Sequence, residues 1–164
     1  MASASQYVSS CGLLLLPIFA WNALLTPRLP ASVVHAMSAS GVSPWLRYLE
    51  NGSRTVVLLL PFAMPLDLSS TSARNGLGAY IVGTGLYCLS WLALIRYPAS
   101  TWARSRMGQL GPAYTPAVWL FGMALLGRRL YWGQWYGWWM YLVPSGLFLG
   151  AHLTHAVLGR SRTV

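Results

Sequence analysis

The stretch RYLENGSRTVVLLL, residues 47–60, places three charged residues at the start of a long apolar run. Arg47, Glu50 and Arg54 are spaced by three and four residues, so on a helix they share one face. Glu50 is one of only two acidic residues in the chain, and Asp67 is the other. The stretch predicts a helix that enters a lipid bilayer. It leaves open whether Glu50 only neutralises the membrane edge or belongs to a working site.

The composition of the whole chain agrees with a membrane environment. Its 164 residues are 55% hydrophobic and only 8% charged, and the mean hydropathy is +0.50. A soluble domain carries about 25% charged residues, so this chain has too few to cover a surface that faces water. The length suits one domain. We therefore predict a single transmembrane domain over residues 1–164.

Apolar runs of membrane-spanning length occur five times. About 20 helical residues cross a hydrocarbon core of about 30 Å, and the runs predict an all-α integral membrane protein. The expected fold is a bundle of five transmembrane helices, with a short interfacial segment between the first and the second. The predicted helices cover about residues 7–25, 44–68, 77–96, 113–128 and 138–158.

Positive charge is distributed unequally between the two ends of this bundle. The net charge of +9 comes from eleven arginines, and eight of them fall on one side of the predicted membrane. The positive-inside rule then places the C-terminus in the cytoplasm and the N-terminus outside, in the bacterial inner (plasma) membrane. The arginines form no basic stripe, which argues against nucleic-acid binding. The predicted cytoplasmic side holds Arg28, Arg47, Arg54, Arg96, Arg104, Arg106, Arg160 and Arg162. The predicted outer side holds Arg74, Arg128 and Arg129.

The outer end carries an aromatic run, YWGQWYGWWMY, at residues 131–141. Trp and Tyr prefer the membrane interface, so the run is typical of an aromatic belt. Asp67, at the same end, is interpreted as a helix cap or a surface charge. Membrane lipids are the expected partners of the whole exterior.

Polar side chains from all five predicted helices reach the cytoplasmic half. Ionisable residues inside a membrane are costly and usually face the bundle interior, where they find partners. We therefore predict a polar pocket at this depth, which binds or transforms a small lipophilic molecule. Its candidate residues are Asn22, Glu50, Arg54, Trp91, Tyr114, Thr115, His152 and His155.

Two of these residues form the candidate catalytic pair. A buried carboxylate and a buried imidazole can exchange protons near neutral pH, which gives this role to Glu50 and His152. Arg54 is the expected anchor for an anion or carbonyl, and Tyr114 a hydrogen-bond donor. If the protein is an enzyme, an isomerase, cyclase or transferase fits this set. A hydrolase is disfavoured, because the chain has no GxSxG motif.

Three of the same residues offer a minor alternative, a divalent metal site. His152 and His155 share a helix face, and Glu50 could complete a set of two imidazoles and one carboxylate. The HExxH signature of zinc peptidases is absent, and HxxH occurs often by chance. No cofactor is therefore predicted, and the metal is kept as a secondary interpretation.

Two other functions remain open at this point. A proton-coupled transporter is favoured by a lone membrane carboxylate and by proline in four of the five predicted helices. A structural or assembly subunit of a larger complex is the third possibility. Gly146 and Gly150 form a GxxxG pattern, which permits close helix contact in a homo-oligomer.

In helix number, length and content of nine tryptophans, the chain resembles the tryptophan-rich sensory (translocator) proteins. Members of that family bind porphyrins and sterols. The resemblance lies in composition, and it assigns no site residues.

Overall fold

The computed structural model of the chain describes residues 9–30, 34 and 43–160. Regular structure in this part is helical, and no β-strand occurs there, so the all-α prediction is confirmed. The described elements are η1 (Cys11–Leu14), α2 (Leu15–Leu25), η2 (Thr26–Arg28), α4 (Pro44–Leu59), η3 (Leu60–Ala63), α5 (Thr71–Arg96), α6 (Thr101–Arg104), α7 (Arg106–Tyr114), α8 (Pro116–Leu126) and α9 (Trp139–Arg160).

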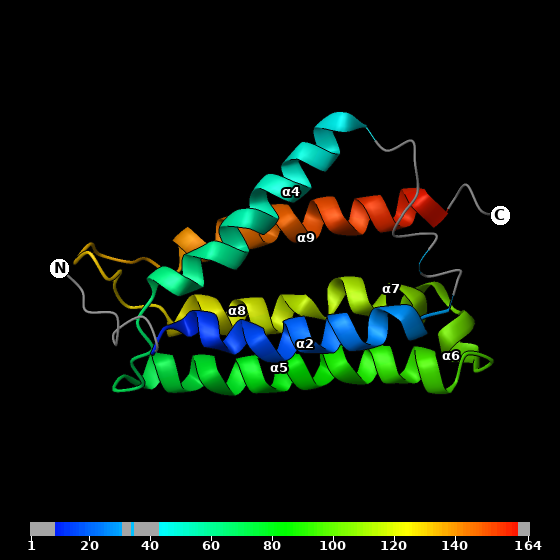
Figure 1. Ribbon diagram of the computed structural model, residues 1–164, viewed down its shortest axis with the longest axis horizontal. Helices are drawn as coiled ribbons and strands as arrows, with labels where there is room; N and C mark the ends of the chain where they lie inside the picture. Colours follow the sequence, from blue (N-terminus) through cyan, green and yellow to red (C-terminus); the bar gives the residue numbers. More distant parts are fainter. Residues whose placement is uncertain (1–8, 31–33, 35–42, 161–164) are drawn as a thin grey trace.

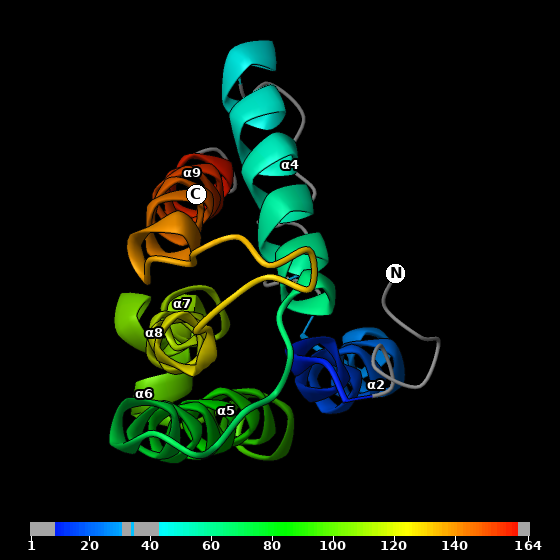
Figure 2. The ribbon, with the colours of Figure 1, turned by 90° about the vertical axis from the view of Figure 1, so that its left-hand side faces the viewer.

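The helices run back and forth along the long axis of the molecule, as Figure 1 shows. α4 and α9 lie together on one side, and α5, α8 and α2 lie on the other (Figures 1 and 2). α4 leans away from the remaining helices toward its N-terminal end (Figure 1).

Within the described residues, three helical stretches are long and apolar enough to cross a membrane: Cys11–Arg28, Thr71–Arg96 and Trp139–Leu158. The longest, α5, has 26 residues and measures about 39 Å at a rise of 1.5 Å per residue. The chain thus has the character of a membrane protein. The other two segments predicted to cross the membrane form shorter helices, because α4 ends after 16 residues and the predicted helix 113–128 is divided between α7 and α8.

Prolines explain where these shorter helices end. Pro61 and Pro65 have no backbone N–H, and a proline within an α-helix removes a backbone hydrogen bond and crowds the preceding turn. The predicted helix 44–68 is therefore α4 up to Leu59, followed by the 3-10 turn η3 and then by non-helical backbone. Pro116 separates α7 from α8 in the same way, so the predicted helix 113–128 contains the boundary between two helices.

α5 begins at Thr71, six residues earlier than the sequence indicated. Ser70 adopts an extended backbone, and its hydroxyl oxygen accepts a hydrogen bond from the Ala73 N–H at 3.1 Å. A serine at this position caps a helix start. The Ser/Thr cluster at residues 69–73, whose composition predicts a turn, therefore provides the cap and the beginning of α5. The predicted start at residue 7 and most of the interfacial segment lie outside the described residues.

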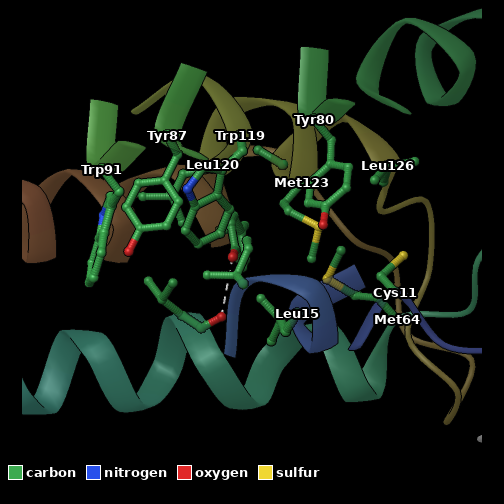
Figure 3. Close-up of a cluster of buried hydrophobic side chains, with 14 of the residues drawn as sticks. Cys11, Leu15, Met64, Tyr80, Tyr87, Trp91, Trp119, Leu120, Met123 and Leu126 are labelled. Carbon is green, nitrogen blue, oxygen red and sulfur yellow. Dashed lines mark hydrogen bonds between the residues drawn. The ribbon is translucent and has the colours of Figure 1, made fainter. Parts of the chain in front are cut away.

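Glycines allow α5 and α8 to pack backbone against backbone. A methyl group added at Gly83 would lie 2.3 Å from the backbone nitrogen of Trp119, and one at Gly122 would lie 2.4 Å from that of Tyr80. Only a residue without a side chain permits such an approach. Beside this contact lies a buried core that contains Leu15, Met64, Tyr80, Leu120, Met123 and Leu126 (Figure 3).

The connection from α8 to α9 turns at the end opposite the charged stretch of α4 (Figure 1). Gly133 has a φ of +80° there, a conformation that glycine adopts without strain. Arg128 lies 3.7 Å from the Asp67 carboxylate, which also accepts from the Ser69 N–H at 3.0 Å. The hydrogen bonds from Ser69 hold the pKa of Asp67 below its ordinary value. Four tryptophans of this end are exposed: Trp132, Trp135, Trp138 and Trp139.

Candidate functional site

A buried carboxylate joins α4 to α9. Glu50 is only 4% exposed, although its side chain is ionisable. Its Oε1 lies 2.9 Å from Nδ1 of His152, and its Oε2 lies 2.8 Å from Nδ1 of His155. Both imidazoles reach the same carboxylate because residues three apart on a helix share one face. The described structure therefore brings together both halves of the predicted acid–base pair.

The hydrogen bonds decide how the protons are arranged. An ionised carboxylate can only accept hydrogen bonds, so each imidazole donates from Nδ1. In a neutral imidazole the other nitrogen, Nε2, is then an acceptor. Glu50 thus orients His152 and His155 and sets their tautomer, as a second group orients the histidine in catalytic triads.

Arg54 completes this cluster from the next turn of α4. One of its terminal nitrogens donates to Oε1 of Glu50. Its guanidinium carbon lies 5.4 Å from the ring centroid of Phe148. The Phe148 ring also stacks on the His152 ring, with 5.4 Å between the two ring centroids. Such a contact between a cation and an aromatic face is attractive. Arg54 is 41% exposed and keeps further N–H donors for a ligand.

A cavity of about 350 Å³ lies at the centre of the bundle. It falls within the range of about 300–1,000 Å³ that small-molecule sites occupy. Helices α2, α4, α5, α7, α8 and α9 all contribute to its wall, and most of that wall is apolar. Apolar members include Leu15, Ile18, Val57, Leu58, Leu110 and Trp119, and the polar side chains are Asn22, Thr26, Arg54, Tyr87, Gln109 and His152.

A second cavity, of about 260 Å³, lies on the polar side of the cluster. Arg47, Glu50, Asn51 and His155 line it, together with Arg54, His152 and Ala156. The last three residues also line the central cavity. The two cavities are therefore neighbours, and Arg54 and His152 are part of the boundary between them.

Three buried polar atoms at these walls have no hydrogen-bond partner within the described residues. Two are the indole nitrogens of Trp91 and Trp119, residues that are 3% and 5% exposed and line the central cavity. The third is Nε2 of His155, at the wall of the polar cavity. Buried polar groups are normally hydrogen-bonded, and each exception needs a reason. A ligand with polar atoms would supply one.

Four of the predicted site residues line the central cavity: Asn22, Arg54, Trp91 and His152. The amide oxygen of Asn22 accepts a hydrogen bond from the Tyr87 hydroxyl, so its N–H groups are the atoms it can offer to a ligand. Figure 3 shows Tyr87, Trp91 and Trp119 close together above α2 and α4. Glu50 and His155 line only the polar cavity.

Two predicted residues, Tyr114 and Thr115, line neither cavity. The Thr115 hydroxyl instead donates to the backbone oxygen of Gly111 at 2.7 Å, one helical turn earlier. Pro112 and Ala113, from the same turn, lie at the cavity wall in their place. Which side chains of a helix face the cavity depends on the rotation of the helix about its own axis. The segment around Tyr114 is short, and its pattern of apolar residues does not predict this rotation.

Among the wall residues that sequence reasoning missed are Tyr87, Gln109, Trp119 and Phe148. Tyr87 lies four residues before Trp91, so a helix-face argument would have included it. Phe148 likewise lies four residues before His152. Gln109 is outside the predicted fourth helix, and Trp119 carries no signal that separates it from the other tryptophans.

The metal interpretation finds no support in the described part of the chain, where no three His, Cys, Asp or Glu side chains are placed to hold one ion. Glu50, His152 and His155 are close together, but their facing atoms are engaged with one another in hydrogen bonds. The two cysteines described, Cys11 and Cys88, are free thiols.

Comparison of the chain with protein-family models, with curated proteins and with solved structures finds no match. The resemblance to the tryptophan-rich sensory proteins therefore remains one of composition. Arguments about function must come from the site.

Proposed function

We propose that the protein is a five-pass membrane protein that binds a small lipophilic molecule in its central cavity and exchanges a proton with it. The five passes are α2 with η1, α4 with η3, α5, α7 with α8, and α9. Their alternating direction (Figure 1) supports a bundle that begins and ends on opposite sides of the membrane. The distribution of arginines favours the N-terminus outside and the C-terminus in the cytoplasm. In this orientation the Glu50 cluster lies in the cytoplasmic half of the membrane.

The observation that carries the proposal is the cavity of about 350 Å³, which meets a charged cluster at one wall. Its apolar wall suits a lipophilic ligand, because burial of apolar surface is favourable by about 25 cal/mol per Å². Its few polar side chains suit the orientation of one polar group. A purely structural ion pair between Glu50 and Arg54 would not require a cavity beside it.

His152 is the residue through which a proton would move. Its Nδ1 is held by Glu50, which leaves Nε2 as the nitrogen for a ligand in the central cavity. Glu50 does not line that cavity, so we assign it a positioning role and revise the predicted pair accordingly. Proton transfer of this kind serves an isomerase, cyclase or transferase.

Occupancy of the cavity can be tested with lipids that remain bound during purification. We expect mass spectrometry of the protein in a nonionic detergent to detect a co-purified lipophilic molecule. Ala113, which is buried at the cavity wall, becomes the test position, and Ala117, which is exposed nearby on α8, the matched control. Ala113→Phe should abolish the co-purified molecule, whereas Ala117→Phe should retain it. Equal retention by both variants would refute binding in this cavity.

The proton-transfer part needs its own test, with the molecule that the first experiment identifies. In D₂O, we expect the wild-type protein to exchange carbon-bound protons of that molecule faster than solvent alone. His152→Gln should lose the acceleration and still bind the molecule. If the wild-type protein gives no acceleration, the protein is a binder and the acid–base step is wrong.

The alternatives place different demands on the same residues. A proton-coupled transporter requires the cavity to communicate with both faces of the membrane in turn. A structural subunit requires Glu50→Gln to destabilise the fold without affecting any bound molecule. Homo-oligomers through Gly146 and Gly150 remain a separate proposal, and both glycines lie on the exposed side of α9 with open space around them.

A further inference from the structure

The two cavities differ in polarity, although they share Arg54, His152 and Ala156. The central cavity presents mainly aliphatic and aromatic side chains. The polar cavity presents two guanidinium groups, two imidazoles, one amide and one carboxylate. A molecule that occupied both would need an apolar part and a polar part, with the polar part next to Arg54.

The charges of the polar cavity favour an anion. With neutral imidazoles, the two positive charges of Arg47 and Arg54 exceed the single negative charge of Glu50. Both oxygens of that carboxylate are already engaged by His152, His155 and Arg54. Glu50 is therefore a poor partner for a ligand cation, while the arginines keep unused donors.

Arg47 and His155 supply the groups that lack a partner. In the described part of the chain, Arg47 forms no ion pair with either acidic side chain. The buried Nε2 of His155 has no hydrogen-bond partner there either. A carboxylate or phosphate in the cavity could accept from the arginines and, when His155 is protonated, from this nitrogen. Hydrogen bonds between ionised partners are about twice as strong as neutral ones.

From this arrangement, and building on the proposed function, we propose that the ligand is a single-chain anionic amphiphile. Its hydrocarbon chain occupies the central cavity, and its carboxylate or phosphate head occupies the polar cavity between Arg47 and Arg54. His152, at the boundary, then lies beside the atoms that join head to chain. Amphiphiles of this class are available from the lipid leaflet that surrounds the bundle.

The test compares probes that differ only in the head group. Delipidated protein in a nonionic detergent is titrated with palmitate, hexadecyl phosphate, hexadecanol and inorganic phosphate, and bound probe is counted by native mass spectrometry. We expect the two anionic amphiphiles to bind roughly tenfold or more tightly than hexadecanol, the gain of one or more charge-assisted hydrogen bonds. Inorganic phosphate should compete weakly, because it has no chain.

Arginine variants locate the head group. Arg47→Gln and Arg54→Gln should each remove most of the preference for the anionic amphiphiles and leave hexadecanol binding unchanged. Arg106→Gln, at an exposed arginine of the same end, is the matched control and should behave as the wild-type protein. Arg47 makes no contact with Glu50 of ion-pair length, so Arg47→Gln remains informative if Arg54→Gln fails to fold.

The outcomes separate this inference from the proposed function. Equal binding of palmitate and hexadecanol, unchanged by Arg47→Gln, would refute the anionic head and leave the lipophilic cavity in place. Competition by inorganic phosphate as strong as that of hexadecyl phosphate would reduce the site to one for free anions. If no long-chain probe binds, both the inference and the proposed function are wrong.

Discussion

Removal of the Glu50 carboxylate gives the most direct measure of the cluster between α4 and α9. Glu50→Ala leaves Arg54 and two imidazoles without their shared acceptor, while the shape of α4 is kept. Glu50→Gln retains an oxygen that can accept one hydrogen bond, but it removes the charge. The amide nitrogen of the glutamine would face an imidazole Nδ1, which must then change its tautomer.

The contacts of Glu50 set the expected magnitude. Removing one partner of a buried charged pair costs about 3–5 kcal/mol. Arg54 is 41% exposed, so water screens its share, and an exposed pair contributes only about 0–1 kcal/mol. The hydrogen bonds to the two partly buried imidazoles carry the rest. We expect Glu50→Ala to lower the free energy of unfolding by about 2–3 kcal/mol and Glu50→Gln by about 1–2 kcal/mol.

The assay is equilibrium unfolding in mixed detergent micelles, monitored by circular dichroism. The natural control is Asp67→Asn, at the only other acidic side chain, which is substantially exposed and paired at 3.7 Å with Arg128. This variant should have a free energy of unfolding close to that of the wild-type protein. If Glu50→Ala costs no more than Asp67→Asn, the carboxylate does not hold α4 to α9, and the reasoning about the site is refuted.

Three further predictions follow from the described contacts. Gly83→Ala should destabilise the fold by about 1–3 kcal/mol through overpacking, because the added carbon would lie 2.3 Å from the Trp119 backbone nitrogen. At Gly85, on the same helix, an added carbon meets open space, so Gly85→Ala should be neutral or stabilising. Thermal unfolding measures both variants. Tyr141→Phe should cost about 0.5–1.5 kcal/mol in the same assay, because it removes a buried hydroxyl that donates to a backbone oxygen of α4 at 3.2 Å; no loss would show that this bond is absent. Since the pKa of Asp67 is lowered from 3.8 in the folded protein, its contribution to stability is present above about pH 4 and is lost as the pH falls through the folded pKa. In this acidic range, the free energy of unfolding of Asp67→Asn should depend less on pH than that of the wild-type protein. An unchanged pH dependence would contradict the assignment.

Much of the fold could be predicted from local sequence features. Helical character and approximate positions follow from apolar runs, and the ends of α4 and α7 coincide with Pro61 and Pro116, which cannot donate a backbone hydrogen bond. The start of α5 was misplaced because the Ser/Thr cluster is polar in composition but acts as a helix cap. The number of membrane passes is still a proposal, since the three helices that meet the length and hydropathy requirements do not include α4 or α7 with α8.

The site was predictable in part. Glu50, Arg54, His152 and His155 were found because charge is rare and costly in apolar segments, so each such residue stands out. Tyr114 and Thr115 were chosen on depth alone, and the rotation of their helix turns other residues to the cavity. Tyr87, Trp119 and Phe148 escaped notice because aromatic residues are common throughout this chain.

The sequence by itself determined that the chain is helical, apolar and poor in acids, and it predicted that Glu50, His152 and His155 lie at similar depths. Only the tertiary structure decided that one carboxylate receives two imidazoles from a helix about 100 residues away. It also decided that this cluster separates an apolar cavity from a polar one. The physical reason is that spacing along a chain defines faces and depths of single helices, whereas cavities and shared hydrogen bonds depend on how separate helices rotate and pack.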